Sequence, residues 1–97
     1  MKIDETILKK ALQQWGTESQ LELAIEELLE LALALQKLKR LRGDHLKKMK
    51  NVFDEMADVR IMFAQLEIIF KPYENQIDER TEFKMKRLEE RIKENLP

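Results

Sequence analysis

Five carboxylates stand out in this sequence because they interrupt segments that are otherwise apolar. They are Glu26, Glu27 and Glu30, in a Glu-Glu-x-x-Glu run, and Glu55 and Asp58, in a Glu-x-x-Asp pair. Residues three or four apart share one side of a helix, so each group can present carboxylates in one direction. Placing an unpaired carboxylate on an apolar surface is costly, and such groups normally have a cationic partner or a metal ion.

Two explanations account for these acids: they are solvated or ion-paired, as is common on helices, or they bind a metal. No lysine or arginine precedes Lys37 in the segment that carries the first run, and Arg60 points away from the second pair. Four carboxylates from two helices, with no cysteine and the single histidine His45, suit magnesium or manganese. Because bound magnesium usually takes phosphate oxygens as ligands, this explanation favours a phosphate ester or anhydride substrate.

The composition predicts a few long helices that position these acids. The chain has 97 residues, 43% of them hydrophobic, with only two glycines and two prolines, and good helix formers dominate. This length corresponds to a single domain, 1–97, and the expected fold class is all-α. Apolar residues recur at helical spacing in four segments, about 4–15, 20–41, 51–70 and 76–94.

Capping and turn residues set the expected helix boundaries. Ser19 and Glu22 have the spacing of a capping box, which predicts the start of the second helix, and Asn51 is the expected cap of the third. Pro72 ends the third helix because proline cannot continue it. The basic segment 37–50 contains a glycine and is expected to include a mobile loop.

The second helix is apolar around most of its circumference, which indicates neighbours on several sides. A chain of this length buries only about 60 to 65% of its unfolded surface, so its own core is thin. Short connections between long helices favour antiparallel packing. We therefore expect a four-helix-type bundle that associates into a homo-oligomer, either a dimer or a tetramer.

Charge and hydropathy exclude several classes of function. The formal net charge is −1, with 18 basic against 19 acidic residues, so there is no global positive field to hold a nucleic acid polymer. No apolar run approaches the ~18 residues that a membrane span requires, and no signal-peptide pattern begins the chain. We expect a cytoplasmic protein with neither a membrane nor a nucleic acid polymer as partner.

Taken in order, the two acidic motifs resemble the signature of the MazG-like all-α nucleoside triphosphate pyrophosphohydrolases. The resemblance covers nearly the whole chain, and the matching segments are similar to those of small phage and bacterial members. It is carried by Trp15-Gly16, Gln20-Leu21, Ala24-Ile25-Glu26-Glu27-Leu28, Asp54-Glu55-Met56-Ala57-Asp58-Val59 and Lys84-Met85-Lys86-Arg87-Leu88-Glu89-Glu90-Arg91. A lone Glu-Glu-x-x-Glu run is unspecific, whereas both motifs at suitable spacing are specific.

The resemblance implies hydrolysis of a nucleoside triphosphate between its α and β phosphates, which yields a monophosphate and pyrophosphate. By this likeness Glu27, Glu30, Glu55 and Asp58 are ligands of Mg²⁺, for which Mn²⁺ can substitute. Glu26 supports these ligands, binds a second ion or orients water. Glu26 and Glu27 are the candidate catalytic residues, and which acid takes a proton from water stays open. A house-cleaning role toward non-standard or excess nucleotides is the matching biological expectation.

Five further residues are candidate substrate contacts, each with a structural alternative. They are Trp15, Gln20, Lys37, Lys84 and Arg87. Trp15 can stack on a base or fill an interface, and Gln20 can hydrogen-bond a base or be an ordinary first-turn residue. Lys37, Lys84 and Arg87 can bind phosphate oxygens, the last two across a subunit interface, or lie on solvated helix faces. The lysines of 47–50 can steer an anionic substrate or belong to a solvated loop.

Two other classes of function are compatible with the same pattern. The chain can be a non-catalytic helical assembly protein that keeps the acids for structural reasons. It can also be a nucleotide- or metal-binding regulatory module without turnover. Magnesium dependence separates catalysis from assembly, and analysis of the products separates catalysis from binding alone.

Overall fold

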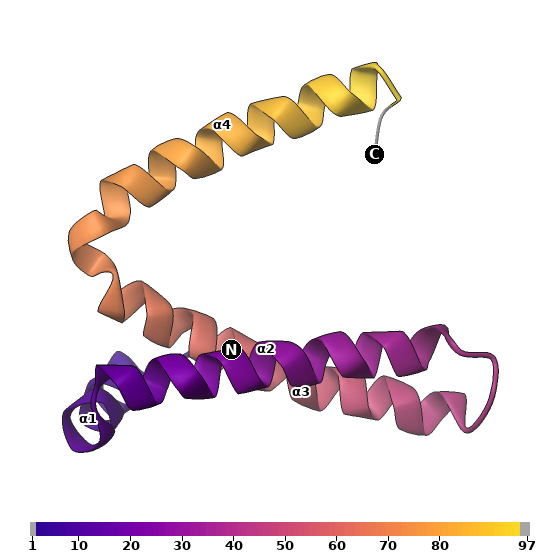
Figure 1. Ribbon diagram of the computed structural model, residues 1–97, viewed down its shortest axis with the longest axis horizontal. Coiled ribbons are helices and arrows are strands. Elements are labelled where there is room, and N and C mark those ends of the chain that lie inside the picture. Colours follow the sequence, from indigo (N-terminus) through magenta and orange to yellow (C-terminus); the bar gives the residue numbers. More distant parts are fainter. Residues whose placement is uncertain (1, 96–97) are drawn as a thin grey trace.

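The computed structural model describes residues 2–95, which form four α-helices, one short 3-10 helix and no strand (Figure 1). The elements are α1 (Glu5–Trp15), α2 (Thr17–Lys39), α3 (His45–Ile69), η1 (Lys71–Tyr73) and α4 (Glu74–Lys93). The all-α fold class is therefore confirmed. Within the same residues, no helix combines the length and the apolar character needed to cross a bilayer.

The helices α2 and α3 form an antiparallel hairpin, which is the centre of the fold (Figure 1). Ala24 and Ala34 from α2 and Val52 and Met62 from α3 are the buried apolar residues of this hairpin. The distance between packed helices depends on the side chains at their contact, so small alanines let the two backbones approach closely. This close contact holds the middle of α2 against the middle of α3.

The loop of the hairpin is shorter than the sequence pattern predicted. Asp44 caps α3, because its side chain accepts hydrogen bonds from the backbone N–H groups two and three residues further on. An aspartate cap satisfies N–H groups that a helix start leaves unpaired, and α3 therefore begins at His45. The predicted cap Asn51 lies inside α3, and the long loop expected within 37–50 is wrong in extent.

Lys48 ties the beginning of α3 back to this loop. Its ammonium group donates hydrogen bonds to the backbone oxygens of Arg40, at 2.8 Å, and of Arg42. Gly43, between them and the cap, has a φ of +87°, a conformation that costs glycine little. A lysine that the sequence pattern placed in a solvated loop is therefore a helical residue that helps to close the hairpin.

The connection between α1 and α2 is a single residue, Gly16, with a φ of +84°. Glycine adopts this conformation without strain, which allows α2 to start at Thr17 immediately after α1 ends. Ser19 lies inside the first turn of α2 and makes no cap, so the predicted capping box is wrong. Glycine conformation, rather than a side-chain cap, determines where α2 begins.

A buried amide holds α1 against the hairpin. The Gln65 side chain is fully buried, and its Nε2 donates to the backbone oxygen of Leu8 at 2.9 Å and to Gln20 Oε1 at 3.0 Å. Leu8 itself is the buried apolar residue of α1. One side chain of α3 thus links α1 and α2, and without it the buried side-chain oxygen of Gln20 would lose this hydrogen bond.

The helix α4 extends away from the other helices after the turn at Pro72 (Figure 1). Every residue of α4 is exposed, and α4 does not run along α2 or α3. The described residues of one chain therefore contain a helical hairpin, a short helix packed on its end and a projecting helix. A closed bundle of four helices would need contacts that α4 lacks within a single chain.

Candidate metal centre

Three carboxylates meet in the middle of the hairpin. One oxygen from each of Glu27, Glu55 and Asp58 lies within 4.8 Å of the others. Glu27 follows buried Ala24 by three residues, and Glu55 follows buried Val52 by the same step. The helical faces that make the hairpin contact therefore also carry these acids, which explains how they come together between two apolar surfaces.

Burial and mutual repulsion both act on Glu27 and Glu55. Burial raises the pKa of Glu27 above its ordinary value, and the charges of Asp58 and Glu30 raise it further. Burial also raises the pKa of the Glu55 carboxyl, with Glu30 as its strongest charged neighbour. Within residues 2–95, Oε2 of Glu27 and Oε2 of Glu55 are buried and have no hydrogen-bond partner. A cation between these oxygens would relieve both effects.

The fourth predicted ligand, Glu30, lies one turn further along α2. It is exposed but close enough to raise the pKa of both Glu27 and Glu55. Glu26 is also exposed, and it does not belong to the group of three carboxylates that approach one another. Because consecutive helical residues point about 100° apart, Glu26 cannot share the direction of Glu27.

A cleft of about 280 Å³ continues from the carboxylates toward the loop. Glu30 and Glu55 line one part of it, and Lys37 and Lys48 line another; Leu33, Ala34 and Asn51 complete the wall. The structure therefore brings the predicted phosphate contact Lys37 next to the acids. Lys48 and Asn51 also line the cleft, and the sequence pattern had assigned them to a loop and to a helix cap.

A simple register explains which residues meet. Residues at equal distances from the midpoint of the loop face each other in an antiparallel hairpin. Gln20 faces Gln65 in this way and is hydrogen-bonded to it, Glu27 faces Asp58, Glu30 faces Glu55, and Lys37 faces Lys48. With the midpoint of the loop where the structure has it, counting equal distances along the sequence pairs Lys48 with Lys37.

The other predicted substrate contacts lie away from this cleft. Gln20 is buried and its side-chain oxygen accepts the hydrogen bond from Gln65, so it serves the fold. Trp15 is exposed at the end of α1. Lys84 and Arg87 are exposed on α4, which does not approach the carboxylates within the chain.

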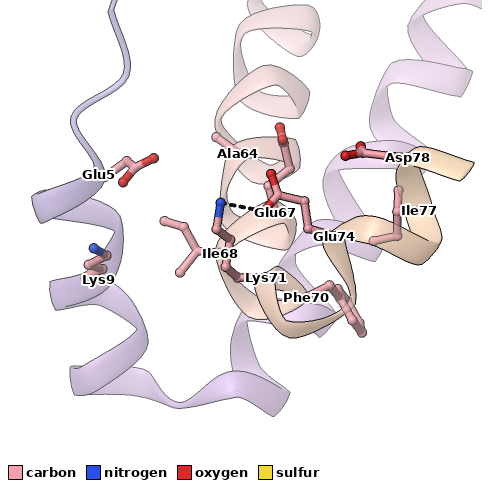
Figure 2. Close-up of a pocket in the computed structure, with 10 residues that line it drawn as sticks. All are labelled: Glu5, Lys9, Ala64, Glu67, Ile68, Phe70, Lys71, Glu74, Ile77 and Asp78. Atoms are coloured by element: carbon pink, nitrogen blue, oxygen red, sulfur yellow. Dashed lines mark ion pairs between the residues drawn. The ribbon is translucent and has the colours of Figure 1, made fainter. Parts of the chain in front are cut away.

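A larger cavity of about 390 Å³ lies at the elbow between α3 and α4 (Figure 2). Its wall is partly apolar, with Ile68 and Ile77, and partly charged. Lys71 is paired there with Glu74 at 2.6 Å, and both side chains are more than half exposed. This cavity has no group of three converging carboxylates, so its size does not make it the metal centre.

The donor set of the hairpin fits a hard divalent cation. Carboxylate oxygens are the ligands that Mg²⁺ and Mn²⁺ prefer, and Glu27, Glu55 and Asp58 offer them from two rigid helices. No family model, no curated protein and no solved structure matches this chain. The likeness to the MazG-like enzymes thus rests on the sequence motifs alone.

Proposed function

We propose that this chain is a magnesium-dependent nucleoside triphosphate pyrophosphohydrolase of the MazG-like kind. The observation that carries the proposal is a cleft with Glu30 and Glu55 at one end and two lysines at the other, in which Glu55 also belongs to the group of three converging carboxylates. Carboxylates suit the metal, and lysines suit phosphate oxygens. A site for metal binding alone would not require both kinds of group.

The carboxylates have distinct parts in this proposal. Glu27, Glu55 and Asp58 would hold Mg²⁺, with Glu30 as a further ligand beside them. When bound, the metal neutralises phosphate charge and lowers the pKa of a coordinated water. Glu27 borders the position of the metal and is one candidate for taking a proton from the coordinated water. Glu26, exposed beside it, is the other candidate base.

The lysines would bind the phosphate chain of the substrate. Lys37 lies seven residues beyond Glu30, a rise of about 10 Å along α2. Lys48 faces Lys37 across the hairpin and is held by the loop carbonyls of Arg40 and Arg42, so its position is fixed before a ligand arrives. Cations placed in advance stabilise the negative charge that develops on a leaving phosphate group.

The reaction follows from the family likeness. The oxygen of water attacks the α-phosphorus, its proton passes to a carboxylate, and the bond from the α-phosphorus to the bridging oxygen breaks. The products are a nucleoside monophosphate and pyrophosphate. We further propose a homo-oligomer as the active form, in which Trp15, Lys84 and Arg87 of a neighbouring copy reach the substrate.

A panel of nucleoside triphosphates, incubated with and without Mg²⁺, tests the proposal directly. We expect monophosphate and pyrophosphate, separated by chromatography, only when the metal is present. Nucleoside diphosphate and phosphate as products would mean that the bond is wrong. No turnover by a folded protein that binds Mn²⁺ in calorimetry would favour the regulatory metal-binding alternative, and no metal binding would favour the assembly alternative.

A further inference from the structure

The tip of the α2–α3 hairpin, residues 37–50, carries a positive charge that the net charge of the chain conceals. The tip contains seven lysines and arginines and one acid, a formal charge of +6. The rest of the chain contains eleven basic and eighteen acidic residues, a formal charge of −7. The loop of the hairpin lies at one end of the molecule, so the charge is segregated in space as well as in sequence (Figure 1).

Ion pairs do not neutralise this charge. Asp44 is the one acid of the tip, and its side chain accepts hydrogen bonds from the backbone N–H groups of Leu46 and Lys47. The ion pairs that the structure describes within residues 2–95 lie between residues 71 and 93. Cations that are gathered without acidic partners repel one another, so an anion bound among them would be stabilised.

An open cavity of about 730 Å³ lies in the tip. Four cationic residues line it together with two others; they are Lys37, Arg40, Leu41, Arg42, Gly43 and Lys48. Lys48 is half-buried, and its ammonium group donates to the backbone oxygens of Arg40 and Arg42. Because these hydrogen bonds use the backbone, they hold the loop and leave both guanidinium groups for a ligand. Guanidinium groups bind phosphate oxygens through paired hydrogen bonds.

This tip cavity continues the cleft that leads from the carboxylates. Lys37 and Lys48 line both spaces, so a ligand that passes the two lysines enters the tip cavity. Arg40 lies three residues beyond Lys37, about 5 Å further from the carboxylates at a helical rise. The hairpin therefore presents carboxylates, then two lysines, then two arginines along its length. A linear chain of phosphates suits this order, because the metal can hold one end and successive cations the rest.

We propose that the tip cavity is a second phosphate-binding site, built around Arg40 and Arg42, and that nucleotides with four or more phosphates are preferred substrates. The nucleotide part of this inference rests on the proposed function, whereas the phosphate site does not. The lysines of the cleft already serve a triphosphate, so the arginines beyond them are left for additional phosphates.

The proposal specifies the products of a longer substrate. Water attacks the α-phosphorus of a nucleoside tetraphosphate, its proton passes to a carboxylate, and the bond to the bridging oxygen breaks. The products are a nucleoside monophosphate and inorganic triphosphate. The arginines would stabilise the far end of this leaving group.

Two inorganic chains and two substitutions test the second phosphate site without turnover. Titration calorimetry compares linear triphosphate with linear tetraphosphate in Ca²⁺, at about 0.15 M salt, where charges more than about 8 Å apart are largely screened. Arg42→Gln removes a cation from the wall of the cavity. Lys39→Gln removes the same charge from the same tip but not from that wall, so it is the matched control. Both side chains are exposed, and both variants should keep the helical circular dichroism of the wild type.

We expect the wild type to bind tetraphosphate about tenfold more tightly than triphosphate, since the fourth phosphate gains charge-assisted hydrogen bonds. Arg42→Gln should remove most of this gain and leave the affinity for triphosphate within about twofold. Lys39→Gln should keep the gain. Equal affinities of the wild type for the two chains would overturn the proposal. Equal losses in the two variants would also overturn it, because they would indicate a diffuse positive surface instead of a site.

A second titration, in a chelator, separates this proposal from the proposed function. Binding of tetraphosphate that depends on Arg42 to the same extent with and without Ca²⁺ would support the tip site and count against the metal centre. Magnesium-dependent hydrolysis of triphosphates, combined with no gain from a fourth phosphate, would retain the proposed function and overturn the tip site.

Discussion

The α2–α3 hairpin and α4 are built from similar helical sequence, yet they differ in what their apolar residues do. In the hairpin, the faces that pack also carry acids, so burial and charge are concentrated at Glu27, Glu55 and Asp58. In α4, every residue is exposed and the ion pairs are exposed pairs one turn apart. Helical pattern alone therefore does not decide which carboxylates come together in a site. A second helix that packs against the same face brings them together.

The largest effect is expected when one carboxylate is removed from the cluster and another from an exposed surface of α2. Asp58→Asn should lower kcat by about a thousandfold or more, since a metal ligand supplies several kcal/mol of transition-state stabilisation. Glu22→Gln changes an exposed acid on α2 outside the cluster and should leave kcat within about twofold. Steady-state kinetics with the best substrate of the panel measures both. Wild-type rates for Asp58→Asn would remove the metal centre from the mechanism.

Substituting one methionine in each region tests how much that residue contributes to the free energy of unfolding. Met62 is buried in the hairpin, and Met85 is 60% exposed on α4. Met62→Ala should lower the free energy of unfolding by about 2 to 4 kcal/mol, because it opens a cavity in the core. Met85→Ala should change it by less than about 0.5 kcal/mol under dilute, monomeric conditions.

Urea unfolding followed by circular dichroism gives both values. Comparable losses for the two methionine variants in dilute solution would mean that α4 packs within its own chain. If Met85→Ala becomes destabilising only at higher protein concentration, the result would support the proposed homo-oligomer, because oligomer stability depends on concentration.

A further substitution tests whether the lysines of the cleft bind phosphate. Lys37→Met should weaken binding of pyrophosphate by roughly tenfold, since it removes one charge-assisted hydrogen bond. Lys39→Met, two residues further on α2 and outside the cleft, is the matched control and should bind like the wild type. Titration calorimetry with pyrophosphate and Ca²⁺ measures binding without turnover. Equal affinities of the two variants would exclude Lys37 from the phosphate site.

The smallest expected effect is a dependence of stability on pH. The pKa values of Glu27 and Glu55 are raised above 4.5 in the folded chain, so the folded state holds more protons than the unfolded state just above that pH. The stability contributed by these groups is therefore lost as pH rises through the raised pKa values. In the presence of a chelator, Tm should fall from pH 5 to pH 7.5 more steeply for the wild type than for Glu27→Gln.

The control for the pH experiment is again Glu22→Gln, which should keep the steep slope of the wild type. Adding Mg²⁺ should flatten the slope, because a bound cation favours the charged carboxylates. Identical slopes for Glu27→Gln and Glu22→Gln would mean that repulsion within the cluster does not govern stability.

Most of the carboxylates of the candidate site can be grouped from the sequence, but its lysine wall cannot. The spacing of Glu27, Glu55 and Asp58 relative to apolar residues was enough to group them, since helical periodicity relates acids directly to the buried face. It did not place Lys48, because the hairpin loop was expected to be longer. Taking Asn51 instead of Asp44 as the cap of α3 makes the predicted loop too long. An error of a few residues in a loop is enough to misassign the residues near it.

Composition and periodicity are enough to predict that the chain is helical, that its acids lie on apolar faces, and that no cysteine or cluster of histidines competes for a metal. The register of α2 on α3, the hydrogen bond that gives Gln20 a structural role, and the separation of α4 from the hairpin become visible in the packed structure. Periodicity reports which face of a helix is apolar. The partner of that face depends on how the loop aligns the two helices and on contacts between residues far apart in the sequence, such as Gln65 with Gln20.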